Sequence, residues 1–174
     1  MRTVLTTLAV LLLLTPLLGR APDFCRGAFC LPAARSAAAF LGTTCQLAPD
    51  GYRLPLRPLP VDLTLNCSAA SFFALLAALA AGLLAETRPR RPGHDAAILL
   101  AFCYVATLAA NTTRIVLGWH AGVWVRFALP EPYWSGIHLG VGCAVFLLAL
   151  LAAHAAMRWW VRRDYSPCPT TKEH

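Results

Sequence analysis

The stretch Leu65-Asn66-Cys67-Ser68-Ala69-Ala70-Ser71 lies on the border between two different parts of the sequence. The segment before it is polar and rich in proline, whereas the segment after it is a long uncharged run rich in alanine and leucine. As an α-helix, the run from Cys67 to Ala85 is long enough to cross a hydrocarbon core of about 30 Å. The border therefore predicts a cysteine with polar neighbours at a membrane surface.

The composition is that of a membrane protein. Of the 174 residues, 58% are hydrophobic and only 13% are charged, whereas soluble domains carry roughly 25% charged residues. The formal charge of +7 comes from arginines that flank apolar runs, as residues that orient transmembrane helices do. No basic patch with interleaved aromatic residues is present, so we do not expect nucleic acid as a partner. We predict an all-α integral membrane protein, a bundle of about four transmembrane helices with a long N-terminal external loop, and we expect neither a cofactor nor a metal.

Hydropathy divides the chain into four parts. We predict a first transmembrane helix of the signal-anchor kind, an external loop, a core of three spans and a cytoplasmic tail, at residues 1–19, 20–66, 67–157 and 158–174. The three later spans are expected at 67–85, 96–118 and 135–157. A cleaved signal peptide is the alternative for the first helix. The retained helix is favoured, because no clear small-x-small cleavage site precedes Pro22.

The external loop carries weak secondary-structure signals. Residues 33–41 are compatible with a helix, but Arg35 and the short length argue against a span, so an interfacial helix is expected. Four prolines then hold the chain extended. Val61-Asp62-Leu63-Thr64-Leu65 alternates with the period of a strand. We expect substrate contacts in this loop.

Clustered arginines predict the orientation. One cluster follows the second span and another follows the last, namely Arg88, Arg90 and Arg91, and Arg158, Arg162 and Arg163. With four spans both clusters fall on one side, which the positive-inside rule makes cytoplasmic. Five arginines in the external loop weaken the contrast, but they are spread over a much longer segment. We therefore predict a multi-pass plasma-membrane protein with both termini in the cytoplasm.

Three polar borders are predicted to lie at one depth near the external face. Cys67 starts one inward-going span, Arg114 lies near the end of the outward-going span, and His138 lies one turn into the next. A helix N-terminus favours the thiolate of Cys67 through the helix dipole and free backbone N–H groups. Asn111 precedes Arg114 by three residues on the same face and is expected to orient its guanidinium. Ionisable residues in spans are costly, so function is the default hypothesis for them.

Each of these residues also has a structural interpretation. A lone cysteine near a helix start is usually a packing residue, and an arginine near the end of a span often extends to the interface. His138 could be a histidine with a satisfied role in helix packing. Asn111-Thr112-Thr113 matches a glycosylation sequon, which we discount because it lies within or against the bilayer.

The other cysteines are scattered along the chain. Cys103 and Cys143 lie inside apolar runs and are expected to be inert packing residues. Cys25, Cys30 and Cys45 share the external loop, where one pair could form a disulfide in an oxidising compartment. Cys67 is the cysteine that combines a membrane border with polar neighbours.

In these motifs the chain resembles the exosortase/archaeosortase family of membrane-embedded cysteine enzymes. The resemblance rests on Asn66-Cys67-Ser68-Ala69, on Asn111-x-x-Arg114-Ile115 and on Gly136-Ile137-His138, in this order, and covers roughly residues 65–142. Each motif is short, and their order is the specific feature. Many relatives are longer and have more spans, so the chain looks like a compact member, similar to the form called exosortase K.

The resemblance implies a reaction and a substrate class. Cys67 would be the nucleophile, Arg114 the essential cation and His138 the acid/base, with Asn66, Ser68 and Asn111 in support. The partners would be the lipid bilayer and membrane proteins whose C-terminal tail has a recognition motif, a hydrophobic helix and a basic cluster. Such proteins would be cleaved or transferred at the outer face.

Two other function classes stay open. One is a non-enzymatic membrane assembly or anchor protein, in which the three borders are incidental. The other is a four-helix thiol–disulfide oxidoreductase that uses Cys67 with Cys25, Cys30 or Cys45. The chain has no Cys-x-x-Cys motif, which is the usual redox signature and disfavours this second class.

Overall fold

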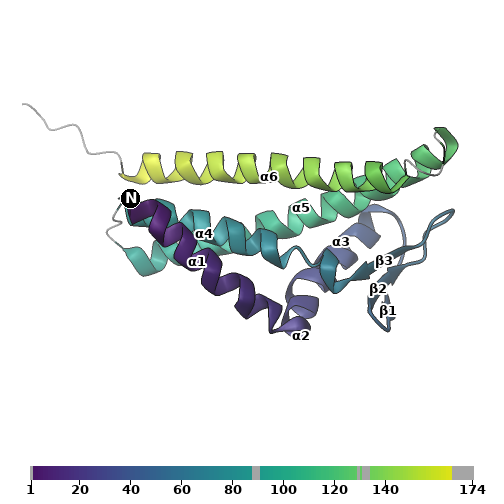
Figure 1. Cartoon of the computed structure of the whole chain (residues 1–174), viewed down its shortest axis with the longest axis horizontal. Helices are drawn as coiled ribbons and strands as arrows, with labels where there is room; N and C mark the ends of the chain where they lie inside the picture. Colours follow the sequence, from purple (N-terminus) through teal and green to yellow (C-terminus); the bar gives the residue numbers. More distant parts are fainter. Residues whose placement is uncertain (1, 88–90, 129, 131–133, 166–174) are drawn as a thin grey trace, which may run out of the picture.

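The computed structural model describes residues 2–87, 91–128, 130 and 134–165. Long helices dominate it, and a short mixed region separates the first helix from the others (Figure 1). In chain order the elements are α1 (Arg2–Gly19), α2 (Pro22–Cys25), a π-helical turn (Arg26–Cys30), α3 (Leu31–Phe40), β1 (Gln46–Ala48), β2 (Gly51–Leu54), β3 (Val61–Thr64), a 3-10 turn (Leu65–Cys67), α4 (Ala70–Thr87), α5 (Pro92–Ala128) and α6 (Trp134–Tyr165).

Three helices, α4, α5 and α6, are long and apolar enough to cross a membrane. The first helix forms a fourth candidate span together with Pro22–Phe40, to which it is joined by a bend of 95°. The prediction of about four spans is therefore confirmed as three to four helices of suitable length and composition. The start of α1, the start of α5 and the end of α6 lie at one end of the molecule, and the sheet lies toward the other (Figure 1).

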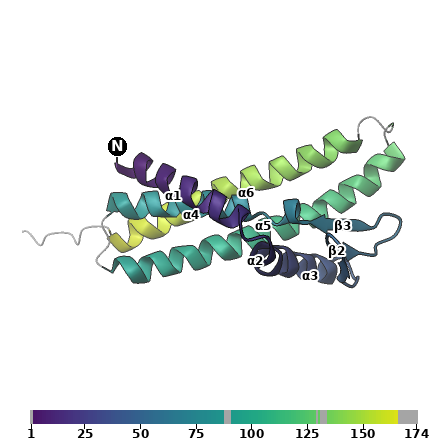
Figure 2. The same ribbon diagram turned by 60° about the horizontal axis from the view of Figure 1, so that its bottom comes forward.

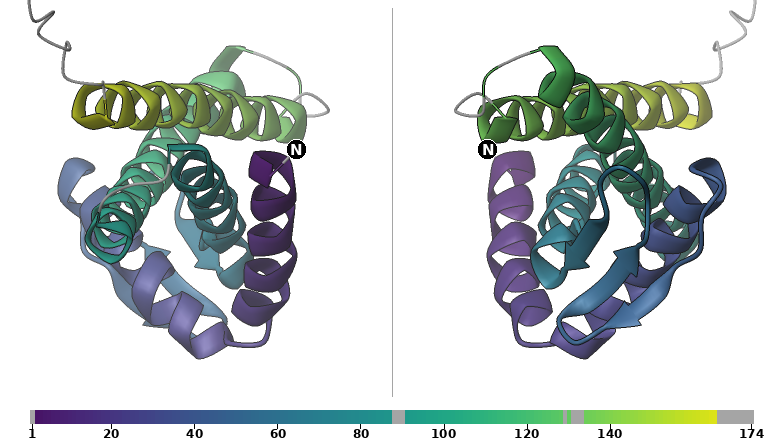
Figure 3. Two further views of the ribbon diagram at one scale, coloured as in Figure 1. Left: turned by 90° about the vertical axis from the view of Figure 1, so that its left-hand side faces the viewer. Right: turned by 90° about the vertical axis from the view of Figure 1, so that its right-hand side faces the viewer.

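The first helix is packed along α4 rather than lying apart from the bundle (Figure 3). A Cβ atom at Gly82 would overlap Oγ1 of Thr7 and would lie 3.3 Å from Cγ2 of Thr3. Thr7 is held by donating a hydrogen bond to the carbonyl oxygen of Thr3 at 2.9 Å. Small residues at helix contacts let backbones approach closely in membranes, so Gly82 fixes the distance between the two helices.

Gly82→Val is expected to destabilise the folded protein by about 1–3 kcal/mol, because overpacking at a rigid contact forces backbones apart. The measurement is the thermal unfolding midpoint of the detergent-solubilised protein. Gly140→Val is the matched control, because a Cβ at Gly140 of α6 would meet no atom within 4 Å. Equal loss of stability in both variants would mean that helix propensity, and not the α1–α4 contact, sets the effect.

The mostly helical chain is compatible with the predicted all-α bundle, but the segment between α1 and α4, which was predicted to be a long loop, contains a small sheet. The three strands form an antiparallel sheet in the order β1-β2-β3. Gly51 allows β2 to approach β3, since a Cβ there would overlap the carbonyl oxygen of Leu63 and its φ is +153°. The predicted strand pattern at 61–65 is confirmed as β3, while β1 and β2 were missed.

The helix expected at 33–41 is present as α3, with one buried face and one exposed face. Its alanine face is buried against the sheet and α5. The members of this core are Cys30, Ala33, Ala34, Ala37, Ala38, Leu54, Leu56, Leu63 and Ile115. Alanine is small enough to let α3 lie close to its neighbours. The layer formed by α3 and the sheet, called the outer layer below, is thereby packed against the middle of α5.

The fifth helix is longer than expected. A break near Asn111 and Arg114 and an end at Gly118 were predicted, but α5 continues to Ala128. Its 37 residues span about 55 Å at 1.5 Å per residue, well beyond a hydrocarbon core of about 30 Å. The helix starts with Pro92 at its first position, and the next proline is Pro130. Glycine weakens a helix without ending it, whereas proline does end it.

The last helix is also longer than the predicted span, because α6 runs past Met157 through the arginines of the supposed tail to Tyr165. Its inner face packs with α4 and α5. Viewed after rotation, the end of α5 and the start of α6 lie at the same end of the molecule as the sheet (Figure 2). The part of α5 that lies beyond Gly118 therefore has the outer layer and α6 as neighbours.

Candidate functional site

Cys67 ends the 3-10 turn that joins β3 to α4. It was expected to start the span itself, but α4 begins at Ala70. Ser68 is buried, and its hydroxyl oxygen accepts a hydrogen bond from the N–H of Ala70 at 3.4 Å, so it serves one of the free donors of the helix start. Ala69 lies between them with a φ of +57°. The cysteine is therefore presented by a tight turn and not by a helix N-terminus.

A left-handed conformation costs a non-glycine residue roughly 1–2 kcal/mol, so the turn at Ala69 is strained. Ala69→Gly is expected to raise the unfolding midpoint of the purified protein, because glycine adopts positive φ without this cost. Ala152→Gly in the exposed middle of α6 should do the opposite, since glycine costs about 1 kcal/mol in a helix. A lower midpoint for Ala69→Gly would contradict the strained turn.

Two residues of α5 bind the main chain of Cys67. Asn111 is buried, with 1% of its surface exposed, and donates from Nδ2 to the carbonyl oxygen of Cys67 at 2.7 Å. Arg114 donates from Nη2 to the same oxygen at 3.4 Å and from Nε to Oδ1 of Asn111 at 3.2 Å. The expected contact between Asn111 and Arg114 is thus present. Because Asn111 is buried, its side chain is not accessible for glycosylation.

The guanidinium of Arg114 is fixed from the other side by α6. Its central carbon lies 5.3 Å from the ring centroid of Phe146, in cation–π geometry. Phe146 is in turn stacked on Phe72 of α4, with ring centroids 4.9 Å apart. A Cβ at Gly142 would lie 3.5 Å from Cδ of Arg114, so a larger side chain would crowd the arginine stem. Sequence reasoning missed Phe146.

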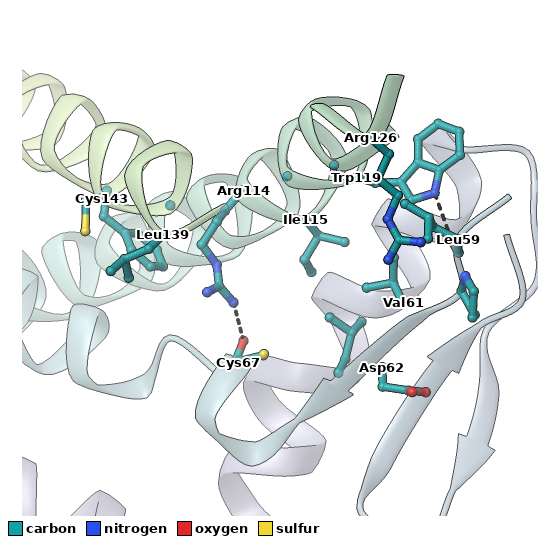
Figure 4. A pocket seen from close by; sticks show the side chains of 16 residues that line it. Leu59, Val61, Asp62, Cys67, Arg114, Ile115, Trp119, Arg126, Leu139 and Cys143 are labelled. Carbon is teal, nitrogen blue, oxygen red and sulfur yellow. Dashed lines mark hydrogen bonds between the residues drawn. The ribbon is translucent and has the colours of Figure 1, made fainter. Parts of the chain in front are cut away.

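Cys67 and Arg114 line a cavity of about 570 Å³ (Figure 4). Its walls come from the segment before and within β3, from α5 and from the first half of α6. Its other lining residues include Leu59, Val61, Asp62, Gly122, Arg126 and Cys143. In the close-up, the guanidinium of Arg114 points toward Cys67 from the α5 wall. The cavity therefore gives a ligand access to both residues.

The remaining predicted residues are placed less fully. His138 belongs to α6 and precedes Gly142 by four residues, which sets its Cα one helical turn away from the contact with Arg114. The side chains of His138 and Asn66 lie outside the described residues. Helix α6 therefore brings the backbone of His138 toward the cavity, while Cys67, Asn111 and Arg114 are joined by direct bonds.

The other cysteines differ in burial and in their neighbours. Every cysteine in the described part of the chain is a free thiol. Cys103 is buried, as expected, whereas Cys143 is exposed and lines the cavity, which corrects its assignment as a packing residue. Cys45 and Cys67 both pack against the core that contains Cys30.

The charges near the sheet are partly neutralised. Arg53 and Asp62 face each other across β2 and β3 and form a bidentate pair, with N–O distances of 2.6 and 2.9 Å. Hydrogen bonds from Arg53 hold the pKa of Asp62 below its usual range. In the described part of the chain, no cluster of three histidine, cysteine, aspartate or glutamate residues could hold a metal ion.

Comparison with known protein families, with curated proteins and with solved structures found no match to this chain. The function proposed below therefore rests on the residues that line the cavity.

Proposed function

We propose that this chain is a membrane-embedded cysteine peptidase or transpeptidase that acts on a polypeptide tail held at the outer membrane face. The observation that carries the proposal is that Arg114 and the buried Asn111 both bind the main chain of Cys67, at a cavity that Cys67 and Arg114 line. Cys67 is more than forty positions away from Asn111 and Arg114 in the sequence. A packing cysteine does not require an arginine and a buried asparagine to fix its main chain.

In the proposed reaction His138 takes the proton from Sγ of Cys67, and the thiolate attacks the scissile carbonyl carbon. Arg114 stabilises the oxyanion that forms, and its fixed position means that little reorganisation is needed. The C–N bond then breaks as His138 returns the proton to the leaving amine. The acyl group remains on Cys67 until water or an acceptor amine attacks it and the thiol is restored. Attack by water gives hydrolysis, and attack by an amine gives transfer.

The membrane setting supports this choice of substrate. The cavity lies where the apolar bundle meets the outer layer formed by α3 and the sheet. A protein with a hydrophobic helix after its cleavage site could diffuse in the bilayer and present that site at this depth. If the arginine cluster before α5 and the arginine cluster in the last part of α6 lie in the cytoplasm, the cavity faces the outside.

A thiol–disulfide oxidoreductase is the second candidate. It is favoured by the packing of Cys45 and Cys67 around the core that holds Cys30. It does not account for the bonds from Asn111 and Arg114 to the main chain of Cys67. In that alternative, oxidised protein would contain a disulfide between Cys67 and one of these two thiols.

The test compares the C-terminal peptides of membrane proteins in cells with and without this chain, by mass spectrometry. The proposal expects a set of proteins that keep a hydrophobic, basic tail only when the chain is absent. An unchanged set of C-termini would contradict the proposal. Non-reducing peptide maps of the same membranes then show whether Cys67 is paired with Cys30 or Cys45, as the second candidate requires.

A further inference from the structure

The cavity runs along one edge of the small sheet. Leu59, Pro60, Val61, Asp62 and Leu63 all line it, although they are consecutive. Successive side chains of a strand point to opposite faces, and Figure 4 shows Val61 and Asp62 pointing in different directions. Three of these residues, Val61, Asp62 and Leu63, are consecutive in β3, and residues from both faces of a strand can line one cavity when it lies along the strand edge. β3 is the last strand in the order β1-β2-β3, so this edge is the one that faces away from β2.

The backbone of Asp62 presents its hydrogen-bonding groups on this edge. The carbonyl oxygen of Leu63 points toward β2, because it lies against Gly51. In an antiparallel strand the N–H and C=O groups of neighbouring residues alternate in direction. The N–H and C=O of Asp62 therefore point away from β2 and toward the cavity. An extended peptide could bind there as an added strand.

The facing wall is shaped to leave room for a second backbone. Four residues of α5 that line the cavity recur every fourth position, namely Arg114, Gly118, Gly122 and Arg126. Residues at this spacing lie on one helix face. A Cβ at Gly122 would have Leu59 Cδ1, at 3.9 Å, as its neighbour from another part of the chain. Gly118 and Gly122 themselves add no side chain to this wall, which also includes Ile115 and Trp119, and an arginine lies at each end of the row.

The edge also leads directly to Cys67. β3 ends at Thr64, and the 3-10 turn that follows carries Cys67. Arg114 and Arg126 are separated by about 18 Å along the helix, which is the length of about five residues of extended chain. Arg114 points toward Cys67, and Arg126 extends from α5 toward β3 (Figure 4). Asp62, which also lines the cavity, is paired with Arg53.

We propose that the substrate segment next to the scissile bond binds as a fourth, extended strand on the free edge of β3, between that edge and the glycine face of α5. The scissile carbonyl then lies at Cys67, and the substrate residue about five positions away lies near Arg126. This assignment rests on the proposed function of Cys67, and it names the binding mode of the substrate.

The first experiment removes the outward N–H of Asp62. Asp62→Pro is tolerated in an edge strand, because proline lacks a donor only on the side away from β2. Cleavage of a tail-bearing protein identified by the C-terminal comparison should fall at least about tenfold, since the added strand loses a hydrogen bond and meets the proline ring. Leu47→Pro places the same change in β1 at the opposite edge, and Arg53→Gln removes the same ion pair. Both should cleave normally.

Labelling of Cys67 by a small thiol-reactive electrophile separates the two levels of the proposal. Asp62→Pro with normal labelling and slow cleavage supports strand addition, whereas normal cleavage overturns it and leaves the function of Cys67 intact. No tail-bearing substrate in any background would instead contradict the proposed function.

A second measurement covers the case in which Asp62→Pro loses labelling as well. In a Cys67→Ser protein, the photo-cross-linking residue p-benzoylphenylalanine replaces Val61 on the cavity edge or Gln46 on the opposite edge strand. Cross-links to uncut substrate are expected at position 61 and not at 46, and the linked peptide should lie next to the cleavage site. Cross-links of equal yield at both positions, or at neither, would overturn the proposal.

Discussion

Cys67→Ser is expected to leave the tail of every substrate uncut while the protein still inserts and folds. An alcohol is far less ionised than a thiol and attacks a carbonyl poorly without a complete activating system. Loss of the nucleophile in enzymes of this type costs on the order of 10⁴-fold or more in rate. The measurement is pulse-chase processing of a tail-bearing protein, at matched levels of the variant in membranes.

Two further cysteines make this prediction specific. Cys103→Ala removes a buried thiol away from the cavity and should leave processing largely intact. Cys143→Ala is the sharper comparison, because Cys143 lines the cavity together with Cys67. It should also retain processing. Activity in Cys67→Ser together with loss in Cys143→Ala would move the nucleophile to α6.

The spans could be predicted because a bilayer imposes a minimum length of apolar helix. The uncharged run after Cys67 and the run before Arg158 needed no tertiary information. The spacing of Asn111 and Arg114 also predicted their contact, since residues three apart share a helix face. These inferences depend on local periodicity, which the sequence carries directly.

The sheet was missed although a usable signal was present. Pro49-Asp50-Gly51 is a turn sequence between two short segments, and the residues on either side of it pair as β1 and β2. The strands have only three or four residues, too few for a convincing alternation. Their apolar partners are the alanines of α3, which tertiary packing alone brings to them.

The partner of Arg114 could not be predicted from side-chain chemistry. The resemblance implied that Arg114 is an essential cation at the site of Cys67, whereas the structure gives a bond to the main-chain carbonyl of Cys67. Every residue has such a carbonyl, so no residue type marks it in advance. The same holds for Phe146, whose role depends on where α6 crosses α5 and on Phe72 behind it.

Arg114→Lys tests whether the arginine is part of the site or only extends to the membrane interface. A lysine would retain a long stem and a cation, and would therefore replace an interfacial arginine. It cannot copy the directed bonds from Nε to Asn111 and from Nη2 to Cys67. We expect Arg114→Lys to insert normally and to lose about 10²–10³-fold in cleavage rate, the usual cost of one preorganised donor.

The control for this change is Arg158→Lys, an exposed arginine near the other end of α6. Its cleavage rate should equal that of the unchanged protein. Arg114→Gln adds a second comparison, because glutamine keeps a donor but removes the charge that would stabilise the oxyanion. If Arg114→Lys cleaves at a normal rate, the arginine is not part of the mechanism. A loss in Arg114→Lys that Arg114→Gln shares, with labelling of Cys67 retained in both, would place the directed guanidinium at the transition state and not merely a positive charge.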